Sequence, residues 1–375
     1  MSRARTFYEF FAGGGMARVG LGEAWSCAFA NDFDPLKAAT YRANFADAAE
    51  HLHEGDVWAV EPSRLQPYAD LAWASSPCQD FSLAGGRAGL AGGRSSAFFG
   101  FWRLIRALGS AAPRIVVIEN VVGLLTSHGG TDFTALCQAL AEEGYVFGAL
   151  EIDAARFVPQ SRPRVFVVAA RQRPAPGLIG ASPFHTRAVR QAHERLPAAL
   201  AARWVWWRGE APPVRNTDLA SVLEPDEAVA WHDEDRTRAL LALMSPQHLA
   251  RIDAARAAGG RKVGAVFRRM RVEDGARVQR AEVRFDGLAG CLRTPRGGSS
   301  RQTLVVVEDG RVRSRLVSAR EGARLMGLPD SYRLPRAATG ALHVIGDGVA
   351  SPVVRWLAAE ILDPLLAERR VEAAE

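Results

Sequence analysis

Three reactive groups stand beside short apolar runs of this chain. Cys78 follows the run 71–76 and Pro77, and Glu119 ends the run 115–118. Arg162 and Arg164 alternate with small residues in the segment 160–164, and alternate side chains of an extended backbone point to one face. A thiol, a carboxyl group and two guanidinium groups are the parts needed to attack a flat heterocycle and to stabilise the charge that develops.

Cys78 is the candidate nucleophile among the four cysteines. Most buried thiols are inert, and Cys27 and Cys137 lie within apolar patterns that favour that interpretation. Cys78 differs because a proline precedes it at a strand end and the glycine-rich segment 79–96 follows it. Glycines in such number are typical of a loop that closes over a ligand. Cys291 is the next candidate if Cys78 is not the nucleophile.

A glycine-rich turn near the N-terminus predicts a cofactor site. Gly13–Gly15 stand between a β-type run and a helical pattern, so the backbone can pass close to a ligand at a helix N-terminus. An ordinary tight turn has the same pattern. Asp32 strengthens the prediction because it ends the next β-type run and can hold ribose hydroxyls, and the ring of Phe33 can stack on adenine. Core packing is the alternative for Phe11 and Phe33.

The first 170 residues alternate β-type runs with helical patterns. We expect strands at 6–11, 26–31, 71–76, 114–119, 145–152 and 164–170, and helices at 17–24, 35–44, 98–108 and 131–143. This alternation predicts an α/β, Rossmann-like fold with a mostly parallel sheet and helices on both faces. Ligands bind at the carboxyl ends of the strands in such sheets. Helical patterns return at 318–326 and 351–369, and the last helix is expected to rejoin the first domain.

Composition limits the classes of function. The 375 residues are 48% hydrophobic, and the four cysteines show neither metal-ligand nor disulfide spacing, so we expect no metal. No apolar run approaches the roughly 20 residues of a membrane helix. The first residues leave no room for a signal peptide. A reducing cytoplasm, with the protein associated with the nucleoid, is therefore the expected location.

Positive charge is concentrated in one part of the chain. Residues 171–320 hold 27 basic and 16 acidic side chains, a net charge of +11, whereas the remainder has a net charge of −5. This asymmetry favours a nucleic-acid surface in that segment over an ordinary solvated face.

Together, and in this order, the motifs resemble the DNA (cytosine-5)-methyltransferase family of the bacterial, S-adenosylmethionine-dependent type. The matching stretches are Phe11-Ala12-Gly13-Gly14-Gly15, Pro77-Cys78-Gln79, Glu119-Asn120-Val121, Gln160-Ser161-Arg162-Pro163-Arg164, and the later segments 320–327 and 346–350. The resemblance covers residues 7–170 and 318–357. The family usually has asparagine where this chain has Asp347, so how that residue meets the cofactor stays open.

The resemblance implies a mechanism and a set of site residues. Cys78 would add to carbon 6 of cytosine and so activate carbon 5, while Glu119 protonates or hydrogen-bonds ring nitrogen 3. Arg164 would reach the cytosine carbonyl oxygen and Glu119, and Arg162 would brace the cysteine loop. The residues implied for S-adenosylmethionine are Phe11, Gly13, Gly15, Asp32, Phe33, Asp56, Val57, Pro77, Asp347 and Val349.

A cytosine in a duplex must be flipped out before a thiol can reach it, which costs a few kcal/mol. Ser82, Arg87 and Arg94, in the loop after Cys78, are the expected clamp on double-stranded DNA.

The expected domains follow from the motif positions. Residues 1–170 and 337–375 would form a discontinuous catalytic and cofactor-binding domain, 171–317 a target-recognition domain and 318–336 a hinge segment. In the loop 293–301, Arg293, Arg296 or Arg301 is expected to read a guanine, with phosphate contact alone as the alternative. The segment 261–284 is the next candidate for recognition.

Two other functions stay open. Part of the family acts on RNA with the same motifs, so a tRNA cytosine-5 methyltransferase is the alternative, although the basic segment between motifs favours duplex DNA. A non-catalytic DNA-binding module is disfavoured because Cys78, Glu119, Arg162 and Arg164 occur together. We expect a monomer with no stable protein partner and no membrane contact. It would be either a solitary methylase or the partner of a restriction endonuclease encoded nearby.

Overall fold

The computed structural model describes residues 4–65, 68–76, 97–273, 275–293 and 301–372. The chain divides into two compact units. Unit 1 comprises residues 1–153, 163–213 and 348–375, and unit 2 comprises residues 154–162 and 214–347. Residues 171–213 thus pack with unit 1, whereas sequence patterning placed the start of the smaller domain at residue 171.

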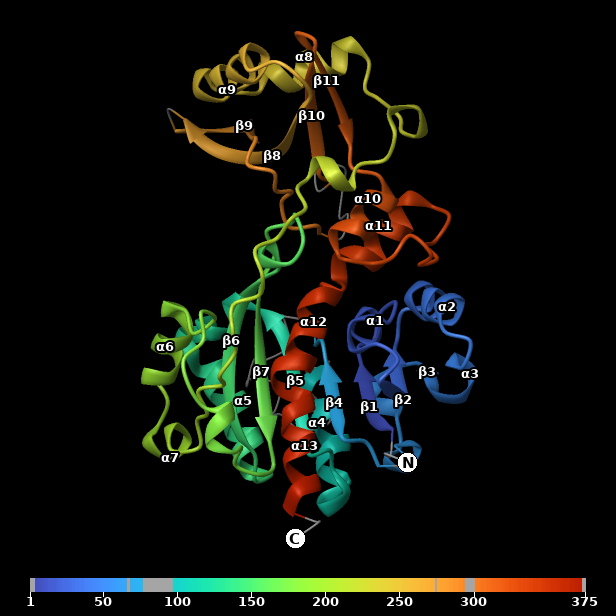
Figure 1. The fold of residues 1–375 in the computed structure, drawn as a ribbon, viewed down its shortest axis with the longest axis vertical. Coiled ribbons are helices and arrows are strands. Elements are labelled where there is room, and N and C mark those ends of the chain that lie inside the picture. Colours follow the sequence, from blue (N-terminus) through green and yellow to red (C-terminus); the bar gives the residue numbers. More distant parts are fainter. Residues whose placement is uncertain (1–3, 66–67, 77–96, 274, 294–300, 373–375) are drawn as a thin grey trace. The chain divides into compact units, whose positions relative to one another are not determined.

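Unit 1 is built on a seven-stranded sheet with the order β3-β2-β1-β4-β5-β7-β6 (Figure 1). Neighbours from β3 to β5 are parallel, and β7 runs antiparallel to both β5 and β6, so the expected mostly parallel sheet is confirmed. The six expected strands are present, and the short β3 was not expected. The bounds are β1 (Arg5–Phe10), β2 (Trp25–Asp32), β3 (Leu52–Glu54), β4 (Leu71–Ala74), β5 (Ile115–Val121), β6 (Val146–Asp153) and β7 (Pro163–Ala170).

Helices cover both faces of this sheet (Figure 1). Alternate strand residues such as Tyr8, Phe10 and Val116 share one core with helices α4 and α5, and the residues between them, such as Trp73 on β4, are buried on the other face. This two-residue period with burial on both sides is typical of a parallel sheet between helical layers. The helices are α1 (Met16–Leu21), α2 (Pro35–Asn44), α3 (Ala48–His51), α4 (Ala97–Ala107), α5 (Thr131–Glu142), α6 (Arg187–Glu194), α7 (Ala198–Ala201), α12 (Ser351–Leu357) and α13 (Asp363–Glu372), with a π-helical turn (Ala358–Leu362) between the last two.

Tryptophans explain why residues 171–213 belong to unit 1. Trp204 forms a β-bridge with Phe147 of β6, and the indole N–H of Trp207 donates to the Val168 carbonyl of β7 at 3.1 Å. A Cβ on Gly148 would lie 1.8 Å from the Val205 carbonyl oxygen, so only glycine allows this close approach. These large rings are removed from water where they pack against the sheet. Their burial places residues 171–213 in unit 1.

The carboxyl group of Glu9 is buried in unit 1. Glu9 lies on β1, and its Oε1 accepts the Arg18 backbone N–H at 3.3 Å, while Oε2 has no hydrogen-bond partner among the described residues. Loss of solvent raises the pKa of Glu9 to about 8, because burial disfavours the charged form.

Unit 2 has a four-stranded antiparallel sheet with the order β11-β10-β8-β9. Its apolar core joins Val266 and Val305 of the sheet to Leu240 and Ile252 of two helices on one face. The bounds are β8 (Lys262–Glu273), β9 (Ala276–Arg284), β10 (Thr303–Glu308), β11 (Arg311–Leu316), α8 (Glu234–Ala242), α9 (Pro246–Ala257), α10 (Ala319–Leu325) and α11 (Ala338–Asp347).

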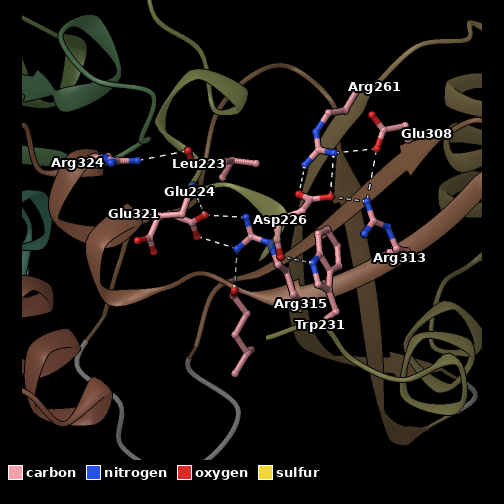
Figure 2. A network of polar contacts seen from close by, with 11 residues as sticks. Leu223, Glu224, Asp226, Trp231, Arg261, Glu308, Arg313, Arg315, Glu321 and Arg324 are labelled. Atoms are coloured by element: carbon pink, nitrogen blue, oxygen red, sulfur yellow. Dashed lines mark hydrogen bonds and ion pairs between the residues drawn. The ribbon is translucent and has the colours of Figure 1, made fainter. Parts of the chain in front are cut away.

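A buried ion pair joins β11 to α10 in unit 2 (Figure 2). Arg315 donates to both carboxylate oxygens of Glu321, at 2.8 and 2.6 Å, and both side chains are 0% exposed. Glu321 also accepts the Glu224 backbone N–H at 2.9 Å and completes a capping box with Ser318. The pair therefore ties a loop, a strand and a helix together.

A second cluster, around Arg313 of the same strand, is partly exposed (Figure 2). Arg313 and Arg261 both contact Asp226, at 2.6 Å each, and both contact Glu308. The hydrogen bond from Arg261, followed by that from Arg313, lowers the pKa of Asp226 to about 2.

None of the described helices of either unit combines the length and apolar character that crossing a membrane requires.

Replacing Glu9 tests its buried charge. A carboxyl whose pKa is raised on folding contributes stability that is fully present below its ordinary value near 4.5 and is lost as pH rises through about 8. The urea concentration at the unfolding midpoint of the wild type should therefore decrease as the pH is raised from about 5 to about 8. Glu9→Gln should make this decrease smaller. Glu23→Gln, at an exposed position, should keep the wild-type slope. Equal slopes in all three proteins would contradict the assignment.

The two clusters on β11 predict unequal costs. Arg315→Met leaves the Glu321 carboxylate buried without its partner and should destabilise unit 2 by about 3–5 kcal/mol in chemical denaturation. Arg313→Met removes an equal charge from a partly exposed pair and should cost about 1 kcal/mol or less. Similar costs for the two variants would show that the buried pair has no special structural role.

Candidate active site

The turn after β1 has the backbone geometry of a ligand-binding turn. Phe11, Gly13 and Gly15 adopt φ values of 56°, 57° and 80°, and a phenylalanine in this left-handed region is strained. A Cβ on Gly15 would lie 2.3 Å from the Phe45 ring, so this glycine is required by packing. A Cβ on Gly13 would meet nothing within 4 Å, so open space borders the turn there.

Hydrogen bonds lock the loops after β1, β2 and β3 to one another. The Ala12 N–H donates to the Asn31 carbonyl and the Gly55 N–H donates to the Asp32 carbonyl, both at 2.9 Å. The Asn31 amide donates to the carbonyls of Gly55 and His53, at 2.9 and 3.0 Å. Three strand ends thus form one rigid corner of the sheet.

The Asp32 carboxylate lies at this corner. It accepts the backbone N–H groups of Gly13 and Asp34, at 2.8 and 2.9 Å. Burial raises its pKa, although these hydrogen bonds oppose the shift. The Phe33 ring is 69% exposed, so core packing does not explain it.

The remaining candidates of this corner differ in exposure. Asp56 is exposed and caps a short 3-10 helix (Val57–Ala59) by accepting the Trp58 N–H at 3.0 Å. Val57 is buried, and Val349, which precedes α12, is buried as well. An open turn, an exposed aromatic face and two carboxylates fit a ligand that carries a nucleoside.

Glu119 and Arg164 meet at the same edge of the sheet. Glu119 lies near the end of β5, and Arg164 lies at the start of β7, where the antiparallel register pairs it with Val121. The Arg164 Nε lies 3.1 Å from the Glu119 Oε1, and the side chains are 17% and 8% exposed. The contact expected from the sequence is present, while the catalytic roles of the two residues stay predictions.

Asn120 belongs to the Glu119-Asn120-Val121 motif but was not among the predicted site residues. Its side-chain amide donates to the Ser76 carbonyl at 3.1 Å, and its carbonyl oxygen accepts the Val121 N–H at 2.9 Å. Ser76 precedes Pro77 and Cys78 in the sequence. Asn120 therefore anchors the last described residue before the candidate nucleophile to the strand that carries Glu119.

Arg162 is a buried residue of unit 2. Its guanidinium group donates to the carbonyls of Leu292 and Gly346, at 2.8 and 2.9 Å. Its neighbour Gln160, also fully buried and also not selected from the sequence, donates to the Leu325 carbonyl at 2.7 Å and accepts the Leu292 N–H at 3.0 Å. Both residues hold distant backbone segments of unit 2 together.

The other candidates of unit 2 lie on its surface. Arg293 is exposed, Arg301 donates to the Thr339 hydroxyl at 2.6 Å, and Asp347 ends α11 with a carboxylate oxygen 3.6 Å from His343 Nε2. Six further candidates lie outside the described residues: Pro77, Cys78, Ser82, Arg87, Arg94 and Arg296.

The cysteines considered inert from the sequence have the expected environments. Burial raises the pKa of Cys27 to about 12, and it also raises the pKa of Cys137, which lies in the main core of unit 1. A thiol that stays protonated at neutral pH is a poor nucleophile.

Comparisons with known proteins agree with this geometry. The chain is 26% identical over 385 residues to the type II methyltransferase M.HpaII of Haemophilus parainfluenzae, a match that covers 96% of this chain and 90% of that protein. It is 33% identical over 165 residues to the type II methyltransferase M.BsuFI of Bacillus subtilis, covering 44% of this chain and 38% of that protein.

A solved structure shows the same fold. The Dnmt2 methyltransferase of S. pombe superposes with a TM-score of 0.61 at 16% identity, covering 96% of this chain and 99% of that one. The sequence model of the C-5 cytosine-specific DNA methylases matches residues 5–363. The chain therefore belongs to the C-5 cytosine-specific DNA methylase family.

Proposed function

We propose that this protein transfers a methyl group from S-adenosylmethionine to carbon 5 of a flipped-out cytosine in a specific double-stranded DNA sequence, through a covalent adduct with Cys78. The observation that carries the proposal is the edge of the sheet where Arg164 holds the Glu119 carboxylate at 3.1 Å. Asn120 ties this edge to Ser76, two residues before Cys78 in the sequence.

The corner formed by the loops after β1, β2 and β3 is the proposed cofactor site. Phe33 would stack on the adenine, Asp32 would hold the ribose and Asp56 would accept from the exocyclic amine, while Phe11, Gly13, Gly15 and Val57 shape the turn around them. Pro77, Val349 and Asp347 complete the proposed set. When bound, S-adenosylmethionine supplies a methyl group on a positively charged sulfur, which is the electrophile of the reaction.

The residues of this chain would prepare the base for that electrophile. The Cys78 thiolate adds to carbon 6, and Glu119 donates a proton or hydrogen bond to nitrogen 3, so the electron pair is directed to carbon 5. After the methyl group is accepted, loss of the carbon 5 proton and departure of Cys78 restore the ring. Arg164 fixes the Glu119 carboxyl group and offers its remaining donors to the carbonyl oxygen of the base.

Arg162 keeps its proposed role of bracing the cysteine loop. Through its contacts with the backbone carbonyls of Leu292 and Gly346, it would also position the recognition segment and the neighbourhood of Asp347. Ser82, Arg87 and Arg94 remain the proposed clamp on DNA, and Arg293, Arg296 and Arg301 the proposed recognition loop.

Replacing the nucleophile tests the covalent step. Cys78→Ser should abolish methyl transfer and leave DNA binding intact, because a hydroxyl is a far weaker nucleophile at neutral pH. The wild type should form an irreversible adduct with duplex DNA that carries 5-fluorocytosine, since fluorine blocks the final elimination. Cys291→Ser is the control and should form the adduct. An adduct with the Cys78 variant would refute the assignment.

Glu119→Gln tests the acid. Glutamine keeps the shape and can contact Arg164, but it cannot donate a proton as an acid, so the single-turnover rate should fall by about 10² or more. Binding of S-adenosylmethionine, measured by calorimetry, should barely change. Near-normal turnover would mean that Glu119 serves only to hold the strand end.

The wild type and the Cys78 variant also test tRNA, the alternative substrate. Methyl transfer to tRNA but not to duplex DNA, with the same dependence on Cys78, would replace the proposed substrate and keep the proposed chemistry.

A further inference from the structure

The hairpin of β8 and β9 extends beyond the sheet of unit 2 as a two-stranded ribbon (Figure 1). The edge of β10 pairs only with residues 262–266 of β8. Among the described strands, residues 267–273 pair only with residues 276–282 of β9. Because successive side chains of a strand point to opposite sides, this ribbon has two faces, which the register assigns.

One face of the ribbon neutralises its own charge. Arg269 and Arg271 of β8 both form ion pairs with Glu282, and Arg280 forms an ion pair with Glu273. The Arg269 guanidinium also lies 5.7 Å from the centre of the Phe267 ring. We call this the paired face.

The opposite face carries arginines that no described carboxylate holds. Arg268, Met270 and Val272 of β8 point to this side, opposite Ala281, Gln279 and Arg277 of β9. Within the described part of the chain, Arg268 and Arg277 form no ion pair with an acidic side chain, unlike the arginines of the paired face. We call this the open face.

The open face also exposes apolar side chains. Met270 is 49% and Val272 is 74% exposed, although both lie within a strand. In the adjoining part of the sheet the same side of β8 and β9 carries Val266, Ala281 and Val283, which α8 and α9 cover. Beyond those helices the apolar row continues uncovered between two arginines.

We propose that the open face enters the major groove of the target DNA and reads base edges there, a role that rests on DNA being the substrate proposed above. The major groove admits a two-stranded ribbon, and its edges offer the chemistry that this face matches. The forks of Arg268 and Arg277 fit the two acceptors of guanine, Gln279 fits the acceptor and donor of adenine, and Met270 and Val272 fit the methyl group of thymine.

The division of charges decides between the two faces. An arginine already held by a glutamate must break that contact before it can contact a base. Among the described residues, Arg268 and Arg277 have no such contact to break. A polyanion is also the partner that its positive charges attract. The ribbon therefore adds a reading element to the loop 293–301, which follows β9 in the sequence.

Paired double variants of the full-length protein test this role. Arg268→Ala/Arg277→Ala removes two charges from the open face, and Arg269→Ala/Arg271→Ala removes two from the paired face of the same ribbon. Arg268→Lys/Arg277→Lys keeps the charge but loses the two-pronged fork. All positions are exposed, and circular dichroism would confirm folding. Each protein is mixed with a pool of randomised duplexes, and the bound fraction is sequenced.

The proposal predicts a specific pattern. Both open-face variants should lose selectivity at one or two base positions by about tenfold or more, the usual discrimination of a two-pronged base contact. The lysine variant should retain the salt dependence of binding to non-specific DNA. The paired-face variant should keep the wild-type selectivity.

Three outcomes would overturn the proposal. They are equal loss of selectivity in the paired-face variant, uniform weakening on all sequences, and full selectivity in the lysine variant. Equal loss in the paired-face variant would indicate that only the overall positive charge of the ribbon matters. Uniform weakening, or full selectivity in the lysine variant, would indicate contact with phosphates alone. The assay measures binding, so it is independent of catalysis. If the wild type selects a sequence but methylates no cytosine in it, the proposed function fails and the role of the ribbon is still decided.

Discussion

The direction of one strand determines where the candidate catalytic groups lie. β7 is inserted antiparallel between β5 and β6, and its register opposes Arg164 to Val121. The start of β7 therefore shares an edge with the end of β5, and Arg164 can hold Glu119. In a parallel β7 of the same eight residues, Arg164 would start at the far edge, about 25 Å away at the usual rise per residue. The pair depends on the topology.

The same edge is made rigid by hydrogen bonds between loops. Asn31, Gly55 and Ala12 join three strand ends, and Asn120 joins a fourth to the strand of Glu119. These hydrogen bonds restrict the movement of the strand ends. Such rigidity suits the proposed reaction, in which a nucleophile, an acid and a cofactor must be aligned within a fraction of an ångström. Stability is lower than it could be at this edge, because Glu9 is buried beneath the glycine turn with a pKa near 8.

The sequence predicted the parts of this structure that depend on local pattern. The apolar runs predicted the long strands. The resemblance of the motifs to a known family predicted the contact between Glu119 and Arg164. The three residues of β3 are too few to carry a two-residue period, and the tryptophans of 201–207 find their partners on β6 and β7 only in the fold. The partners of Arg162 lie 130 and 184 residues away, and the two faces of the ribbon depend on the register of β8 with β9. Such contacts have no local signal.

The central claim is that this chain methylates carbon 5 of cytosine in DNA. The most direct measurement is bisulfite sequencing of DNA from a methylation-free bacterial host that expresses the wild-type protein, with the tRNA of the same cells converted in parallel. If the protein has this activity, cytosines at one position of a short recurring duplex sequence will resist conversion. Complete conversion of the DNA, with or without a protected cytosine in tRNA, would contradict it.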